Sequence, residues 1–174
     1  AGTVTAARSS MSTFGQFAIA FGDFPSFSSS SLYSGTDGQI GAIYIFPNVT
    51  RGVDAWVEIM DIQGGATLDN IDDQSTGYTV CFQPFINYAV NTEGYFEWKI
   101  SFKKAGTPTD TTLRKLTATG VDVDGGSSSG KQIREYIEAT MPTSYSLDAA
   151  STLTITNNNG RYRALGGTGT FSNI

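Results

Sequence analysis

Two carboxylates stand two residues apart in the run Val121-Asp-Val-Asp-Gly125, directly before a turn rich in glycine and serine. Side chains at positions i and i+2 of a β-strand share one face and lie about 7 Å apart. Ca2+ prefers carboxylate and carbonyl oxygens, and a strand end with an adjoining turn can supply both. Asp122 and Asp124 are therefore candidate ligands for Ca2+, the candidate cofactor. The alternative is a solvent-facing strand end that enters a hairpin, because the run lacks the D-x-D-x-D-G pattern of an EF-hand.

A second group of acidic residues lies in the run Leu68-Asp-Asn-Ile-Asp-Asp73. It consists of Asp69, Asp72 and Asp73, whose oxygens are also of the type that a hard cation prefers. If the chain binds a cation, we expect one of the two acidic groups to hold it. For this second group, a solvated loop is the favoured interpretation.

The residue types needed for catalysis are scarce. The chain contains no histidine, so the commonest general base and a common zinc ligand are both absent. Cys81 is the single cysteine; it is flanked by apolar residues and is expected to be a buried, inert thiol. Glu58-Ile-Met-Asp-Ile-Gln63 superficially resembles the E-I-D-x-x-E strand of jelly-roll β-glucanases, but Glu58 and Asp61 point to opposite faces of a regular strand. The sequence predicts that the protein is not an enzyme.

Aromatic side chains offer another kind of chemistry, since exposed rings can stack on sugars. Trp56 is notable because its neighbours in strand phase, Asp54 and Glu58, are polar and place it on the wetter face. The alternative for each ring is that it only covers a neighbouring loop. The candidate carbohydrate-binding residues are Trp56, Tyr33, Tyr44 and Tyr88, with Tyr95 as a further one.

Strands are the elements that must position these side chains. In Gly94–Lys103, apolar residues alternate with polar ones, which predicts a strand with one buried and one wet face, as in antiparallel sheets. Asn157-Asn-Asn-Gly160 predicts a tight hairpin, because Asn and Gly tolerate positive φ. Lys131–Ala139 fits either a short helix or a strand, and we favour the strand. About eight to ten such segments predict an all-β fold, an antiparallel two-sheet β-sandwich of jelly-roll type, as one domain over residues 14–174.

Charge and the start of the chain bear on partners and location. A net charge of −5 argues against nucleic acid and against an anionic membrane surface as partners. No apolar run is long enough to insert into a bilayer. The sequence opens Ala1-Gly-Thr-Val without methionine, which is typical of a chain after signal-peptide removal. We therefore expect an extracellular or cell-surface location.

The segment 1–13 (AGTVTAARSSMST) is small, polar and compatible with an extended strand. Such a segment can add to the sheet of a neighbouring subunit through backbone hydrogen bonds, with a few apolar side chains giving specificity. Val4 and Met11 are the candidate intersubunit anchors. The alternatives are a flexible leader or an edge strand of the same domain.

Three short motifs carry a resemblance: Gly52-Val-Asp-Ala-Trp-Val-Glu-Ile59, Phe82-Gln-Pro84 and Leu116–Gly125. In this order they resemble segments of β-sandwich domains in secreted bacterial surface proteins. The resemblance implies an extracellular role and assigns no function to any residue. Together with the features above, it leads us to expect a structural subunit that self-assembles into a surface filament or layer, as a homo-oligomer or polymer. The alternative is a carbohydrate-binding or adhesin module of a secreted protein.

Overall fold

The computed structural model describes residues 3–9, 16–20, 27, 29–75, 81–87, 93–111, 117–121, 123, 125–128, 131–140, 142–147 and 149–167. All regular structure in these ranges is β-strand, and each strand pair is antiparallel. The predicted all-β, antiparallel class is confirmed.

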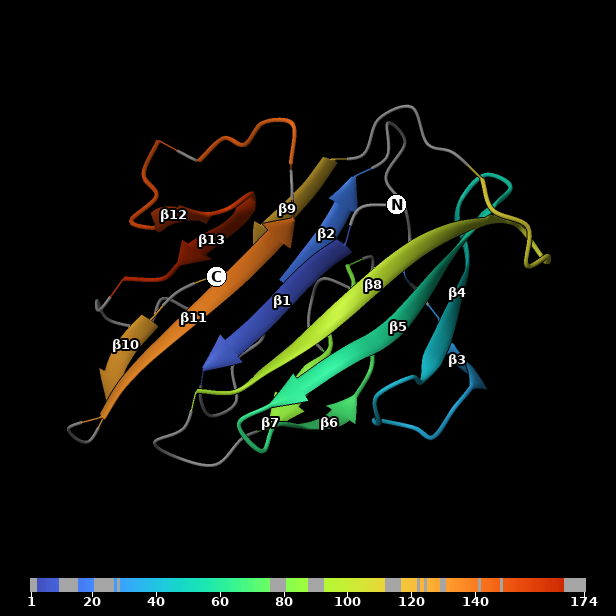
Figure 1. Ribbon diagram of the computed structural model, residues 1–174, viewed down its shortest axis with the longest axis horizontal. Helices are drawn as coiled ribbons and strands as arrows, with labels where there is room; N and C mark the ends of the chain where they lie inside the picture. Colours follow the sequence, from blue (N-terminus) through green and yellow to red (C-terminus); the bar gives the residue numbers. More distant parts are fainter. Residues whose placement is uncertain are drawn as a thin grey trace.

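Nine of the strands form one sheet, whose long members lie side by side in Figure 1. Its order is β12 (Thr154–Asn158), β13 (Arg161–Leu165), β11 (Lys131–Thr140), β1 (Thr3–Ser9), β8 (Tyr95–Lys104), β5 (Val53–Gln63), β4 (Ile43–Thr50) and β3 (Ser31–Ser34), with β10 (Gly125–Ser128) also paired to β11. Two smaller ladders are β2 (Gln16–Ala20) with β9 (Thr117–Val121), and β6 (Thr67–Asn70) with β7 (Phe85–Asn87).

The central strand β8 shows why the sheet has a dry and a wet face. Phe96, Trp98 and Ile100 are buried, whereas Glu97 and Lys99 between them are half-buried, as the alternation predicts. The core formed on the dry face also takes in Tyr44 and Phe46 from β4, Val57 and Ile59 from β5, Ile86 from β7, and Phe27 and Phe82. The segment 81–87 therefore packs against the dry face of β4, β5 and β8.

Aromatic packing fills this core. The Phe82 ring meets the Trp98 ring edge-on with centroids 5.5 Å apart, and Phe96 stacks on Trp98 at 5.2 Å. Phe27 adds a further edge-on contact with Phe46 at 5.1 Å. Large rings in offset or edge-on contact contribute more than the burial of their area alone.

Two local predictions from the sequence are confirmed. Residues 131–140 form the strand β11, and β12 and β13 form a hairpin across the Asn-Gly pair. Asn159 and Gly160 have φ of 53° and 87°, the positive values that a two-residue type I′ turn requires.

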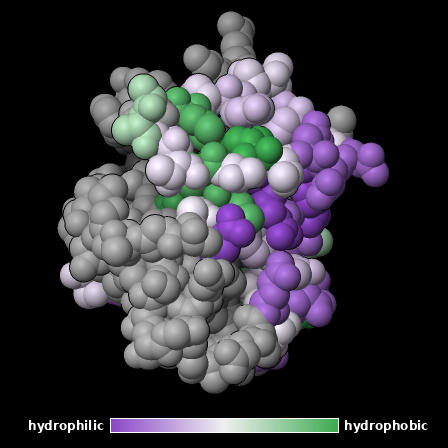
Figure 2. Space-filling view, turned by 90° about the vertical axis from the view of Figure 1, so that its left-hand side faces the viewer, coloured by the Kyte–Doolittle hydropathy of each residue, from purple (hydrophilic) through white to green (hydrophobic). Residues whose placement is uncertain are grey.

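The side of the molecule at the left of Figure 1 is shown in Figure 2. Apolar residues gather in the upper part of this view and are bordered by hydrophilic ones. The loop before β12 belongs to this side and carries the exposed residues Tyr145 and Leu147. The Tyr145 ring lies 5.7 Å from that of Tyr162 in β13, which ties the loop to the sheet.

Candidate functional site

Several of the candidate residues fall outside the described ranges. These are Asp122 and Asp124 of the first acidic group, Tyr88 of the aromatic candidates, and Met11 of the segment 1–13. Calcium binding at Asp122 and Asp124 therefore stays a prediction.

In the second acidic group, the carboxylates of Asp72 and Asp73 accept hydrogen bonds from nearby residues. Asp72 is buried, and its Oδ1 accepts from the Gln83 backbone N–H at 3.1 Å, while its Oδ2 accepts from the Gln74 side chain. Asp73 Oδ1 accepts from the Ser75 N–H at 2.9 Å. Burial raises the pKa of Asp72 to about 6, even though its hydrogen bonds act in the opposite direction.

The described residues contain no group of three or more His, Cys, Asp or Glu side chains that could hold a metal ion. Asp69, Asp72 and Asp73 are thus not brought together as a cation site. Beside Asp72, Cys81 is buried, and burial raises the pKa of its thiol.

Tyr44 turns out to be a core residue. Only 2% of it is exposed; its hydroxyl donates to Asp37 Oδ1 at 2.6 Å and accepts from the Gly38 N–H at 2.7 Å. Burial, followed by the hydrogen bond to Asp37, raises the pKa of Tyr44 to about 12. Because the ring is buried, Tyr44 is removed from the candidate sugar-binding surface.

Tyr33 and Trp56 are brought together on the wet face of the sheet. Their ring centroids are 4.6 Å apart, and Tyr33 is 57% exposed. Trp56 is half-buried beneath it, with the ammonium of Lys103 5.4 Å from the indole centroid. One ring of the pair is therefore accessible, and the other is held between Tyr33 and a cation.

The strand β1 occupies a slot between β8 and β11. It pairs with β11 over Val4–Ser9 and with β8 over Thr3–Ala6. In the described sheet order, β1 is what joins β8 to β11. Val4 has two register partners, Trp98 on one side and Ala139 on the other. The predicted segment 1–13 thus includes a strand that sits inside the sheet of its own chain, not at an edge.

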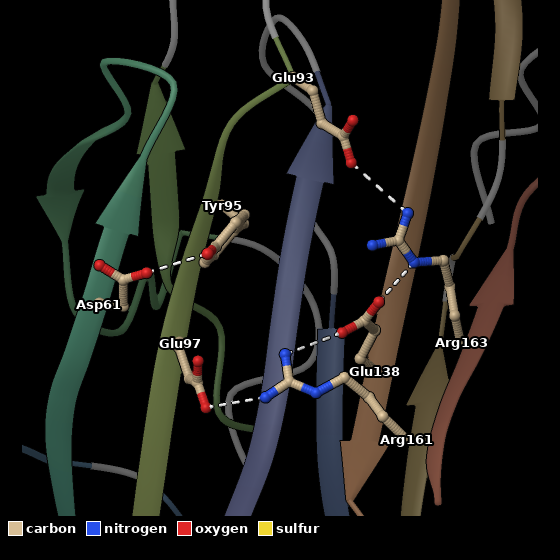
Figure 3. A network of polar contacts seen from close by, with 7 residues as sticks. All are labelled: Asp61, Glu93, Tyr95, Glu97, Glu138, Arg161 and Arg163. Carbon is tan, nitrogen blue, oxygen red and sulfur yellow. Dashed lines mark hydrogen bonds and ion pairs between the residues drawn. The ribbon is translucent and has the colours of Figure 1, made fainter. Parts of the chain in front are cut away.

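A chain of ion pairs crosses the same part of the sheet, on its wet face (Figure 3). Arg161 of β13 contacts Glu138 of β11 at 3.3 Å and Glu97 of β8 at 3.2 Å. Arg163 contacts Glu138 through its Nε, and Glu93 through its Nη1 at 3.4 Å. These five residues are hereafter called the Arg161 network.

Two aromatic residues support this polar face. The Arg163 guanidinium lies 3.9 Å from the centroid of the Tyr136 ring, a cation–π contact. The Tyr95 hydroxyl donates to Asp61 Oδ2 at 2.9 Å, and this bond lowers the pKa of the Asp61 carboxyl. A register shift in β5 between Ile59 and Asp61 brings Asp61 to the same face as Glu58, so the expectation that these two point to opposite faces is wrong. Burial works to lower the pKa of Arg163, but its bond to Glu138 and the nearby negative charge raise it overall.

Sequence reasoning missed the Arg161 network. The available signal was local: Arg161 and Arg163 stand two apart directly after the predicted Asn157–Gly160 turn, so they share one face of the strand that follows it. Their partners, Glu97 and Glu138, lie far away in the sequence, and only the pairing of β13, β11, β1 and β8 brings them together.

No family model, no curated protein and no solved structure matches the chain. In the part of the chain that the structure describes, there is no helix with the length and apolarity to cross a membrane.

Proposed function

We propose that this protein is an extracellular structural subunit, which self-assembles into a surface filament or layer by adding a strand of one subunit to the sheet of the next. The proposal includes a two-sheet sandwich of jelly-roll type, in which the β2–β9 and β6–β7 ladders contribute to the second layer. The observation that carries it is the slot between β8 and β11. One short strand, β1, which comes first in the chain order of the strands, fills this slot.

Strand exchange at this slot conserves the interactions that the strand makes. If β1 of one chain leaves and β1 of a second chain enters, the same backbone bonds form in the same register. The balance is then set by concentration, since a tethered strand competes at an effective concentration on the order of millimolar. A high local concentration of subunits at a surface therefore favours the intersubunit arrangement.

The sequence supports the location. An acidic chain whose short motifs resemble segments of domains in secreted bacterial surface proteins fits an extracellular or cell-surface role. Val4 remains the candidate intersubunit anchor, because it has register partners in both walls of the slot.

Disulfide trapping tests where β1 resides. Directly opposite residues of antiparallel strands have Cα atoms about 4.5–5.5 Å apart, within the range that a disulfide spans. One full-length chain carries Val4→Cys and the other carries Ala139→Cys, both with Cys81→Ser; the two are mixed under conditions that promote assembly. We expect a disulfide between the chains, together with filaments or layers in electron micrographs.

The control pairs the Val4→Cys chain with a chain that carries Thr109→Cys at an exposed position outside the register of β1. A double variant, with Val4→Cys and Ala139→Cys in one chain, measures how much of β1 pairs with β11 of its own chain. The proposal fails if the double variant closes its disulfide while the mixed chains cross-link no faster than the control pair.

A second candidate function is carbohydrate binding at Tyr33 and Trp56. The specific observation is an accessible Tyr ring packed on a tryptophan, next to the charged side chain of Lys103. Sugar binding should change the Trp56 fluorescence, and Tyr33→Ala should abolish that change, with Tyr145→Ala as the matched control. An absence of binding on a glycan array would leave this pair as surface packing.

A further inference from the structure

We infer that Arg161 is a latch on the β1 slot, which holds the strand in place and sets how fast it can be exchanged. The inference concerns the regulation of the site described above and so rests on the proposed function. It depends on contacts made by the two strands that flank the slot.

The register places both partners of Arg161 at one level of β1. Thr5 is opposite Glu97 in β8 and opposite Glu138 in β11. Two strands with a third between them lie about 9–10 Å apart, so Glu97 and Glu138 are not direct neighbours in the sheet. Arg161 bridges this gap with separate nitrogens, Nη1 to Glu138 at 3.3 Å and Nη2 to Glu97 at 3.2 Å.

The guanidinium therefore lies across β1 at the level of Thr5. Figure 3 shows it between Glu97 and Glu138. Arg161 itself belongs to β13, on the far side of β11. While both bonds are in place, β1 cannot leave the sheet towards the wet face without parting them. The other face of β1 is on the core side of the sheet, the side on which the buried Trp98 of β8 lies opposite Val4.

Glu138 is the fixed half of the latch. Its side chain is 7% exposed, and it also accepts a hydrogen bond from Arg163, whose other end reaches Glu93. The Glu97 side chain is 21% exposed and has Arg161 as its ion-pair partner among the described residues. Opening should thus begin at the Arg161–Glu97 bond and leave Arg161 on Glu138.

Partly exposed ion pairs are screened by salt, so the latch should loosen as ionic strength rises. The face also carries a pair that does not cross the slot, Lys99 with Glu58 at 3.0 Å, between β8 and β5. It offers a matched comparison, because the side chains of Lys99 and Arg161 are both 41% exposed.

The test compares Arg161→Gln with Glu58→Gln in the full-length protein. Hydrogen–deuterium exchange of the amides in 3–9 measures opening of the slot, and the mixed-disulfide assay measures exchange between subunits. We expect Arg161→Gln to speed both by about three- to tenfold and to remove their salt dependence, while Glu58→Gln changes neither. Arg161→Lys keeps the charge but can reach one carboxylate at a time, so both of its rates should lie between those of the wild type and Arg161→Gln. It replaces Arg161→Gln in the test if that variant does not fold.

The outcomes separate the two ideas. Equal protection of the 3–9 amides in Arg161→Gln and Glu58→Gln overturns the latch, whatever the subunits do. If those amides open faster in Arg161→Gln but the mixed disulfide never exceeds its control, the latch stands and subunit exchange fails. If the mixed disulfide forms at one rate in all variants, exchange stands and the latch fails.

Discussion

Asp54, Asp72 and Glu138 are buried carboxylates, and each has its own set of donors. Asp54 accepts from the backbone N–H groups of Asn48 and Gly106, both at 2.8 Å, and so ties the irregular part of β4 and the turn after β8 to the start of β5. Asp72 organises a turn beside Gln83, and Glu138 receives two arginines. A buried carboxylate without such donors would be strongly destabilising, which is why these residues act as joints between segments.

The Asp72 carboxyl predicts a pH dependence of stability. Its pKa is raised to about 6, above the value near 3.9 of an unfolded chain, so the native state binds the proton more tightly. The resulting stabilisation is fully present below about pH 4 and is lost as pH rises through about 6, a change of roughly 2–3 kcal/mol. Asp72→Asn should remove this part of the pH dependence and be the more stable protein at pH 7, as measured by urea unfolding across that range.

Asn70→Ala is the matched control for Asp72→Asn. It removes the 3.1 Å hydrogen bond from the Asp72 backbone N–H to the Asn70 side chain without removing a titrating group. It should lower stability by a similar amount at every pH. A wild-type and an Asp72→Asn profile that run parallel would contradict the assignment of this transition to Asp72.

Calcium binding by the strand end is a separate prediction at this scale. Because a ligand that binds the native state stabilises it by mass action, millimolar Ca2+ should raise the melting temperature if Asp122 and Asp124 bind it. Asp122→Asn with Asp124→Asn should abolish the difference, whereas Asp69→Asn should preserve it. Identical melting curves with Ca2+ and with chelator would contradict Ca2+ binding and favour the alternative, in which Asp122 and Asp124 lie at a solvent-facing strand end.

At the scale of elements, local patterns were predictable and pairings were not. The alternation in Gly94–Lys103 and the turn at Asn159–Gly160 are encoded by neighbours in the sequence, and both are seen in β8 and in the β12–β13 hairpin. Residues 3–9 gave no comparable signal for their partners, which lie about ninety or more positions further along, because any strand edge can satisfy backbone hydrogen bonds. The Arg161 network follows from that pairing and was out of reach for the same reason.

The turn after β5 offers a sharp test of backbone packing. Gly64 and Gly65 both have positive φ, 66° and 67°, so an alanine is strained at either position. A Cβ on Gly64 would lie 2.0 Å from the Glu93 carbonyl oxygen, whereas one on Gly65 would meet nothing within 4 Å. Gly65→Ala should therefore cost about 1 kcal/mol and Gly64→Ala at least about 2 kcal/mol more. Equal losses of unfolding free energy in the two variants would contradict this prediction and show that the backbone at Glu93 can move away at little cost.

At the scale of the whole molecule, the sheet divides at the slot. On one side lie β3, β4, β5 and β8, which carry most of the aromatic core, and on the other lie β10, β11, β12 and β13. The Arg161 network connects the two sides across the wet face, while β1 connects them through backbone pairing. The β1 strand is thus both a structural joint and the segment proposed to travel between subunits.

This dual role predicts that the chain can be complemented by a peptide. Removal of residues 1–13 should lower the melting temperature, because β8 and β11 both lose a paired strand. A synthetic peptide of residues 1–13 should restore it in proportion to the logarithm of its concentration, as a ligand of the native state does. The same peptide with Thr5→Pro should fail, since proline cannot donate a backbone hydrogen bond within a sheet. If the shortened chain does not fold alone, the readout becomes peptide-dependent refolding. A shortened chain that melts like the full one, or a proline peptide that works as well as the native one, would contradict a docked β1 strand.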